Sequence, residues 1–495
     1  MLAIHGLNLS ANDSDFLILP ELRGVSVTSD PTNRLYFSTP TPGGPNGLGT
    51  TNLGPLIVDL KHTPNQPADN EDLYVTAQLV RTFNAISNVT LTYRVMLSNE
   101  VTVPMFDDGL HGDGLAGDRV WGVVIPASAA SPSQMIRYFV YTTDVRSNST
   151  RFPPFLDANK SPQYQGTVVS DSSLTNPLPV FHWFILNPAA AESSLGTKCS
   201  VFYLGRFYDN CDINLHGQSS QGFPKKSYNV GMNPGYGFVW KEGEKKVGGV
   251  NLLTTWADKS HMRNMLAYDS YRQAGSGYHW VNAIRVQQNG AFFSVANLME
   301  NGDSDYLDRL GLDPNGALYK MYNRFDTPSS TTIGVNTGAE KKTRKNEGNA
   351  DLVALYNGVS QGGQAQVNYV FDNIDIPSTI AMLAGHVLAN DEDCCHKNYY
   401  LYRDSDGTGE WRMLPWDVDL SFGHMWTCNY NGEAACYAYY DPRLFITNAY
   451  SQTTLGIGAG NHVADALFGN PAIYQMYLRR VRTITDEQFQ PPNTH

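Results

Sequence analysis

The chain has 495 residues, of which 41% are hydrophobic and 12% aromatic, and its formal net charge is −12. This composition is typical of a folded protein of two or three domains and excludes a disordered chain. The acidic balance excludes a broad nucleic-acid-binding face, and no apolar run approaches the roughly 18–20 residues that span a membrane.

Residues 1–54 alternate short β-like runs with Gly and Pro, which predicts a partial β segment followed by a linker. The first residues lack a basic region and a continuous apolar region, so they do not form a signal peptide. The chain starts and stops abruptly. We therefore expect a fragment of a longer protein, whose targeting signal lies elsewhere.

Residues 55–150 are predicted to form an immunoglobulin-like β-sandwich. The runs DLYVTAQLV, VTLTYRVML, VWGVVIPA and MIRYFVYTTDV alternate apolar and polar residues with a period of two, and turn signals separate them.

One loop in this region is rich in Asp and Gly: MFDDGLHGDGLAGDRVWG, from Met105 to Gly122. Glycine permits turns that aim several carboxylates at one point, and Ca²⁺ prefers such oxygen ligands. The spacing is not that of an EF-hand. Two interpretations stay open, a structural Ca²⁺ site and a solvated turn; the candidate ligands are Asp107, Asp108, Asp113 and Asp118.

Residues 151–180 are rich in Pro, Ser and Asn and are predicted to be a linker. Residues 181–495 then mix strands with helices, which are expected at 262–275, 349–359 and 377–390. Without regular βαβ repetition, this pattern indicates an α+β domain. The six cysteines include two closely spaced pairs, Cys199–Cys211 and Cys428–Cys436, which are either disulfides or free thiols.

The stretch NDEDCCHKNYYLYRDSDGTGEWRMLPWDVDLSFG, 390–423, carries the most informative spacing. Asp393 lies in a loop, Asn398 follows five residues later, and a predicted hairpin leads to Asp417 and Asp419. Protein kinases present their catalytic Asp and their two metal-binding groups in this order. The order therefore favours phosphoryl transfer, in which positioning and charge neutralisation dominate.

Such a site also needs a cation for the phosphates and a carboxylate to hold that cation. Lys225 and Lys226 follow a flexible polar loop that contains Ser219 and Ser220, and one of the two lysines should face inward on a strand. Glu300 ends an apolar run and is a candidate partner for the inward lysine.

Four motifs together resemble the CotH kinase family, the spore-coat-protein-H-like atypical kinases, over about residues 200–485. They are HGQSSQGFPKKSY, WADKSHMRNMLAYDSYRQAG, SVANLMENGDSDYLDRLGLDPNGALYKM and HKNYYLYRDSDGTGEWRMLPWDVDLSFG. The resemblance implies an atypical-kinase-like α+β domain after the β-sandwich, in a secreted bacterial protein.

The same resemblance implies a role for individual residues. Asp393 matches the catalytic aspartate, Asn398 and Asp417 the metal-binding pair, and Asp419 a second candidate ligand. The phosphate-binding lysine falls on Lys225 or Lys226, with Lys226 favoured, and Glu300 matches its pairing glutamate. The remaining candidates for nucleotide binding are Ser219, Ser220 and Arg263.

The preferred hypothesis is a kinase that uses ATP and Mg²⁺ (or Mn²⁺) to phosphorylate Ser or Thr of extracytoplasmic or cell-envelope proteins. One alternative is a metal-binding surface or adhesion module without turnover. Another is a metal-dependent hydrolase of carbohydrates or esters, with Asp393 and Asp417 as acid and base.

Overall fold

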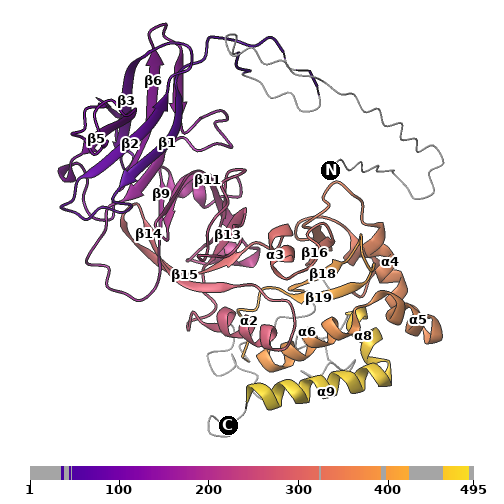
Figure 1. Cartoon of the computed structure of the whole chain (residues 1–495). Helices are drawn as coiled ribbons and strands as arrows, with labels where there is room; N and C mark the ends of the chain where they lie inside the picture. The colour runs from indigo at the N-terminus through magenta and orange to yellow at the C-terminus, as the bar shows by residue number, and fades with distance from the viewer. Residues whose placement is uncertain are drawn as a thin grey trace.

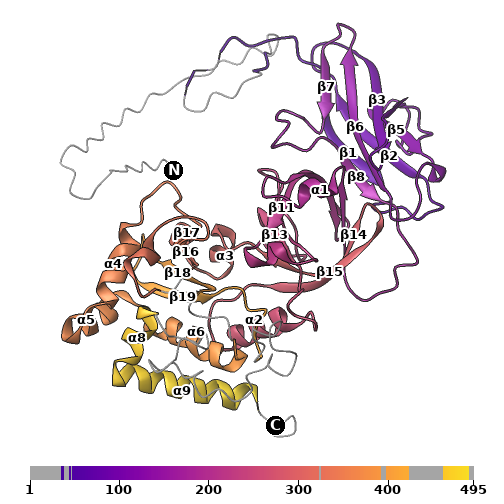
Figure 2. The ribbon, with the colours of Figure 1, turned by 180° about the vertical axis from the view of Figure 1, so that it is seen from behind.

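The computed structural model describes residues 35–37, 44–45, 47–322, 325–391, 397–422 and 461–489. Three consecutive parts follow one another along the molecule: a β-sandwich, a β-barrel, and a sheet covered by helices (Figure 1). The view from behind shows the same order (Figure 2).

The β-sandwich has one sheet of order β1-β2-β5 and a second of order β4-β3-β6-β7, in which β8 also pairs with β6. All its strand pairs are antiparallel. Alternating apolar residues of both sheets form a common core. The strands are β1 (Leu56–Thr63), β2 (Leu73–Val80), β3 (Ile86–Val95), β4 (Val101–Pro104), β5 (Val120–Ile125), β6 (Met135–Asp144), β7 (Ser149–Phe152) and β8 (Gln165–Val168).

The region predicted as a linker, 151–180, therefore contributes to this sandwich. It supplies β8 and the end of β7, and both strands pair with β6. The sequence did not predict these strands for two reasons. The segment is polar in composition, and each strand has only four residues, too few to show an alternating pattern.

The barrel closes in the order β10-β11-β12-β13-β15-β14-β9 and has its own apolar core. Only the pairing of β14 with β9 is parallel within this barrel. Its strands are β9 (Val180–Ile185), β10 (Thr197–Tyr203), β11 (Arg206–His216), β12 (Ser227–Gly231), β13 (Gly249–Leu253), β14 (Val281–Gln288) and β15 (Ala291–Glu300). The barrel region also contains α1 (Pro188–Ala191), η2 (Ser219–Gly222) and α2 (Arg263–Gln273).

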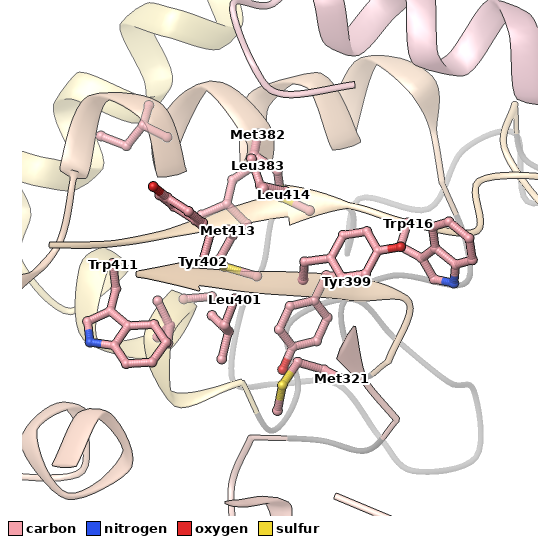
Figure 3. Close-up of a cluster of buried hydrophobic side chains, with 14 of the residues drawn as sticks. Met321, Met382, Leu383, Tyr399, Leu401, Tyr402, Trp411, Met413, Leu414 and Trp416 are labelled. Carbon is pink, nitrogen blue, oxygen red and sulfur yellow. The ribbon is translucent and has the colours of Figure 1, made fainter. Parts of the chain in front are cut away.

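The last part is an antiparallel sheet of order β17-β16-β18-β19 with helices packed against it. Helix α6 lies along the β18–β19 hairpin, where Met382 and Leu383 face Leu414 (Figure 3). Its strands are β16 (Ala317–Met321), β17 (Ala339–Lys341), β18 (Tyr399–Arg403) and β19 (Trp411–Pro415). Its helices are α3 (Ser304–Arg309), α4 (Ala350–Val359), α5 (Gly363–Asn373), α6 (Ile376–Ala389), α8 (His462–Phe468) and α9 (Pro471–Gln488).

The three helices predicted from apolar spacing are confirmed as α2, α4 and α6, and the predicted hairpin is confirmed as β18–β19. The fold class is likewise confirmed, an all-β N-terminal part followed by mixed α and β. Of the partial β segment predicted within 1–54, the described residues show one isolated bridge, between Tyr36 and Thr50.

Candidate functional site

The first group of candidate residues lies at the open end of the β18–β19 hairpin. Tyr399 pairs with Pro415, and the backbone N–H of Trp416 donates to the carbonyl oxygen of Asn398 at 3.3 Å. Asn398 and Asp417 therefore flank neighbouring strand ends. Asn398 is buried, whereas Asp417 is exposed and accessible to a ligand.

Both residues have a left-handed backbone, with φ of 60° at Asn398 and 59° at Asp417. This conformation costs roughly 1–2 kcal/mol for a residue with a Cβ, although Asn and Asp tolerate it better than most. Strained backbone of this kind gathers at functional sites. Two such residues side by side support the hypothesis that this strand end binds a ligand.

The segment that follows Asp417 is fixed by helix α2. Arg263, the first residue of that helix, donates through Nε to the carbonyl oxygen of Ser421 at 3.1 Å and through a terminal nitrogen to Asp258 Oδ1 at 2.6 Å. Burial of Asp258 opposes its ionisation, but hydrogen bonds from Ser260 and Arg263 outweigh this effect and lower its pKa. Arg263 thus links Asp258 to the loop that carries Asp419.

Glu300 was predicted to pair with a lysine, and the structure shows a different partner. Its carboxylate is 1% exposed and binds Arg309, whose Nε lies 3.0 and 2.9 Å from the two oxygens. The backbone N–H of Trp280 donates to the same carboxylate at 3.0 Å. The half-buried Lys226 instead donates to the carbonyl oxygen of Gln221 at 2.6 Å, in its own loop. The predicted Glu300–Lys226 pair is therefore wrong.

Lys225 is the lysine that turns inward. Its Nζ lies 2.5 Å from the carbonyl oxygen of Val295 and 3.4 Å from Thr255 Oγ1, inside the end of the barrel. Burial lowers its pKa. Ser219 and Ser220 begin the short helix η2 just before it, so the polar loop and the inward lysine are close in the chain.

A second lysine, which the sequence reasoning missed, lies on strand β16. Lys320 Nζ is 4.7 Å from the ring centre of Trp416 and 5.0 Å from that of Tyr322. Glu340 lies on the neighbouring strand β17; Lys342 Nζ, just after that strand, binds Glu340 Oε1 at 3.0 Å, and the Tyr322 hydroxyl donates to Glu340 Oε2 at 2.6 Å. The signal was a charged residue inside an otherwise apolar strand, ALYKM.

Electrostatics places this group close to Asp417. Burial lowers the pKa of Lys320, while the carboxylate of Asp417 acts in the opposite direction. Burial also lowers the pKa of His216, at the end of β11, to about 3, and the charges of Lys320 and Lys342 act in the same direction. His216 is therefore neutral at pH 7, and the positive charge here belongs to the lysines.

The proposed catalytic residue Asp393 lies outside the described residues, as do four of the six cysteines. Shortly before Asp393, the side chain of Asp391 is buried and accepts a hydrogen bond from the Tyr271 hydroxyl at 3.2 Å. This contact fixes the end of α6 to α2.

The acidic loop of the β-sandwich uses its carboxylates to hold its own backbone. Asp113 is buried and accepts three backbone N–H groups at 2.8–3.0 Å. Asp107, Asp108 and Asp118 also accept backbone N–H groups of the loop. Within the described part of the chain, no three His, Cys, Asp or Glu side chains gather in a group able to hold a metal. The Ca²⁺ site stays a prediction.

Cys199 and Cys211 occupy directly opposed positions on β10 and β11. Both side chains are buried in the barrel core, and both are free thiols. The alternative of free thiols therefore describes this pair, and Cys428 and Cys436 lie outside the described residues.

The donor atoms at the open end of the hairpin suit a hard cation. Asn398 offers an amide oxygen and Asp417 a carboxylate, and Mg²⁺ and Mn²⁺ both prefer oxygen ligands. The exposed side chain of Asp417 also leaves room for phosphate oxygens and water to complete such a coordination shell.

Two family models match the chain. The model described as CotH kinase protein matches residues 213–495, which is more than half of the sequence. The chain belongs to the CotH kinase protein family. The model described as the second immunoglobulin-like domain of conditioned medium factor matches residues 66–132.

These matches confirm an N-terminal immunoglobulin-like domain followed by a CotH domain with a kinase-like fold. A search of curated proteins found no match. None of the helices in the described ranges is long and apolar enough to cross a membrane.

Proposed function

We propose that this CotH domain is a protein kinase that transfers the γ-phosphoryl group of ATP to Ser or Thr hydroxyls of extracytoplasmic or cell-envelope proteins. The observation that carries the proposal is the pair of strained residues, Asn398 and Asp417, at one end of the β18–β19 hairpin. Kinases place their metal-binding Asn and Asp on the two sides of such a hairpin.

Each residue has a separate role in this proposal. Asn398 and Asp417 hold Mg²⁺ or Mn²⁺, with Asp419 as a further ligand. When bound, the cation neutralises charge on the phosphates. Asp393 orients the acceptor hydroxyl and accepts its proton. Arg263 positions the Asp419 loop through Ser421.

The phosphate-binding lysine on the barrel side is assigned to Lys225. Its partial burial supports this choice, because a desolvated ammonium interacts more strongly with phosphate than an exposed one does. Lys226 is half-buried as well, but its ammonium is bonded at the surface to its own loop, so it is the weaker candidate. Glu300 acts structurally through Arg309 rather than through either lysine.

Incubation of the full chain with labelled ATP and Mg²⁺ or Mn²⁺ tests this function. We expect incorporation of label into the chain or into added protein, and loss of more than about 100-fold in Asp393→Ala and in Asp417→Ala, because each removes a group that acts directly on the reacting atoms. The exposed Asp69→Ala variant is the matched control and should retain full activity.

The opposite result is also defined. Absence of any thermal shift on adding ATP with either metal would contradict the proposal, because a bound ligand must stabilise the native state. Stabilisation by the metal alone, without ATP dependence, would instead favour a metal-binding surface module.

A further inference from the structure

A cationic group lies on the face of the C-terminal sheet beside Asp417. Lys320 on β16 pairs with Glu340 on β17, and Tyr322 and Lys342, just past the ends of these strands, both bind Glu340. All four side chains therefore share one face of the sheet. This group contains two ammonium groups and one carboxylate. Glu340 is bound by Lys342 and Tyr322, which leaves Lys320 without an ion pair at 4.0 Å or less among the described residues.

The surroundings hold Lys320 in place without neutralising it. Its ammonium lies over the rings of Trp416 and Tyr322, at 4.7 and 5.0 Å from their centres. Such cation–π contacts stabilise a charge, yet they leave its N–H groups able to donate. Trp416 directly precedes Asp417 in the chain. A half-buried ammonium without an ion pair among the described residues, beside the carboxylate that we propose as a metal ligand, is suited to an anion that contacts both.

We propose that Lys320, supported by Lys342, binds the phosphate chain of the nucleotide next to the cation held by Asn398 and Asp417. This inference rests on the proposed function and adds a second phosphate-binding lysine to the same site. Lys225 approaches from the barrel, whereas Lys320 belongs to the sheet that carries Asp417.

Charge balance supports a phosphate ligand. Lys320 and Lys342 carry two positive charges against the single negative charge of Glu340, so this face of the sheet has one positive charge in excess. A phosphate oxygen that contacts Lys320 would offset this excess. The ammonium of lysine acts on phosphate as a compact point charge with three donors.

Nucleotide binding by the full chain tests the inference, with Lys320→Met as the variant. Methionine keeps an unbranched apolar stem over Trp416 and Tyr322 and removes only the charge. The matched control is Lys345→Met, because Lys345 is exposed on the same part of the chain. Calorimetric titration would compare Mg²⁺–ATP, Mg²⁺–triphosphate and adenosine.

We expect Lys320→Met to weaken binding of Mg²⁺–ATP and of Mg²⁺–triphosphate by about tenfold or more, and to leave adenosine binding unchanged. Lys320→Arg, which keeps the charge, should restore part of the affinity. Lys345→Met should bind like the unmodified chain.

Three results would overturn the inference, and they differ in what they say of the kinase. If the unmodified chain binds Mg²⁺–ATP and Lys320→Met binds it equally well, Lys320 is not a phosphate ligand, while the proposed function stands. If the unmodified chain binds neither Mg²⁺–ATP nor Mg²⁺–triphosphate, both proposals fail. An equal loss of adenosine and ATP affinity in Lys320→Met would show a structural effect and would also overturn it.

Discussion

Among the candidate site residues that the structure describes, Glu300 has the most deeply buried carboxylate, and its partner is an arginine nine positions along the chain. Two oxygens face the guanidinium of Arg309, in the forked geometry that makes such pairs specific. Glu300 ends β15 and Arg309 ends α3. The ion pair therefore fixes the barrel to the first helix of the following part.

Removing the arginine should destabilise the fold strongly. In Arg309→Met, the Glu300 carboxylate would stay buried without its cation, and breaking a buried pair in this way costs about 3–5 kcal/mol. Urea unfolding followed by circular dichroism measures the free energy of unfolding. The matched variant Lys226→Met, at the lysine first expected to pair with Glu300, should change it by less than about 0.5 kcal/mol. Equal effects of the two variants would contradict the observed pairing.

The identity of the Glu300 partner shows where prediction from sequence ends at this scale. The spacing of Asp393, Asn398 and Asp417 could be recognised in the sequence because these residues lie in one short stretch of the chain. The Glu300 pair depends on how a strand end meets a helix after a turn, which no period in the sequence encodes. Lys320 was missed for a similar reason, because its neighbours Trp416 and Asp417 lie about a hundred residues away in the chain.

At the scale of elements, strands and helices with strong patterning were predictable, and short ones were not. A continuous run of apolar residues predicts helix α6, and two apolar runs around a polar turn predict the hairpin β18–β19. Strands β7 and β8 were not predicted, because each has only four residues. Their pairing with β6, which the local sequence does not show, stabilises them.

The turn between β6 and β7 is stabilised by a single carboxylate, Asp144, which is 2% exposed. It accepts two backbone N–H groups at 2.8 and 2.9 Å and two side-chain amides, of Asn84 and Asn148, at 2.7 and 2.9 Å. Burial opposes the ionisation of Asp144, yet these hydrogen bonds outweigh it and lower its pKa to about 2.

This turn should make the immunoglobulin-like domain sensitive to acid. A pKa lowered from 3.8 to about 2 means that the folded state binds fewer protons than the unfolded state, so the stabilisation is present above pH 4 and is lost as the pH falls toward 2. We expect Asp144→Asn to have a lower Tm at pH 6 and a smaller further decrease between pH 4 and pH 2.5. Thermal scans across this range measure both effects. The exposed Asp69→Asn variant should follow the unmodified chain, and an unchanged slope in Asp144→Asn would count against this role.

At the scale of the whole molecule, the immunoglobulin-like domain is attached firmly to the barrel. Asp209 of β11 is buried and accepts the backbone N–H groups of Gln163 and Tyr164, both at 2.9 Å. Arg137 of β6 reaches the same carboxylate at 3.6 Å. A small apolar cluster joins the two parts as well, formed by Met135, Val168, Phe184 and Phe202. Contacts between segments far apart in the sequence create this interface. The sequence therefore predicted two domains but not the contacts between them.

A pocket of about 310 Å³ lies next to this carboxylate, between the two parts. Its walls come from both sides: Phe152 and Tyr164 from the sandwich region, and Phe207 and Tyr236 from the barrel region. The pocket shows that the interface is held by discrete polar anchors and a small apolar cluster rather than by continuous close packing. Loss of one anchor should therefore have a large effect on the coupling of the domains.

Asp209→Ala should uncouple the two parts. The substitution leaves two backbone N–H groups at the interface without an acceptor, and each costs about 1–3 kcal/mol when it stays buried. We expect the unmodified chain to unfold the sandwich and the barrel in one calorimetric transition, and Asp209→Ala to show a separate transition at lower temperature. Asp212→Ala is the matched control, since this carboxylate lies on the same strand but is 68% exposed and pairs only with Lys198 at the surface. Two transitions already present in the unmodified chain would show that the anchors do not couple the domains, as would one unshifted transition in Asp209→Ala.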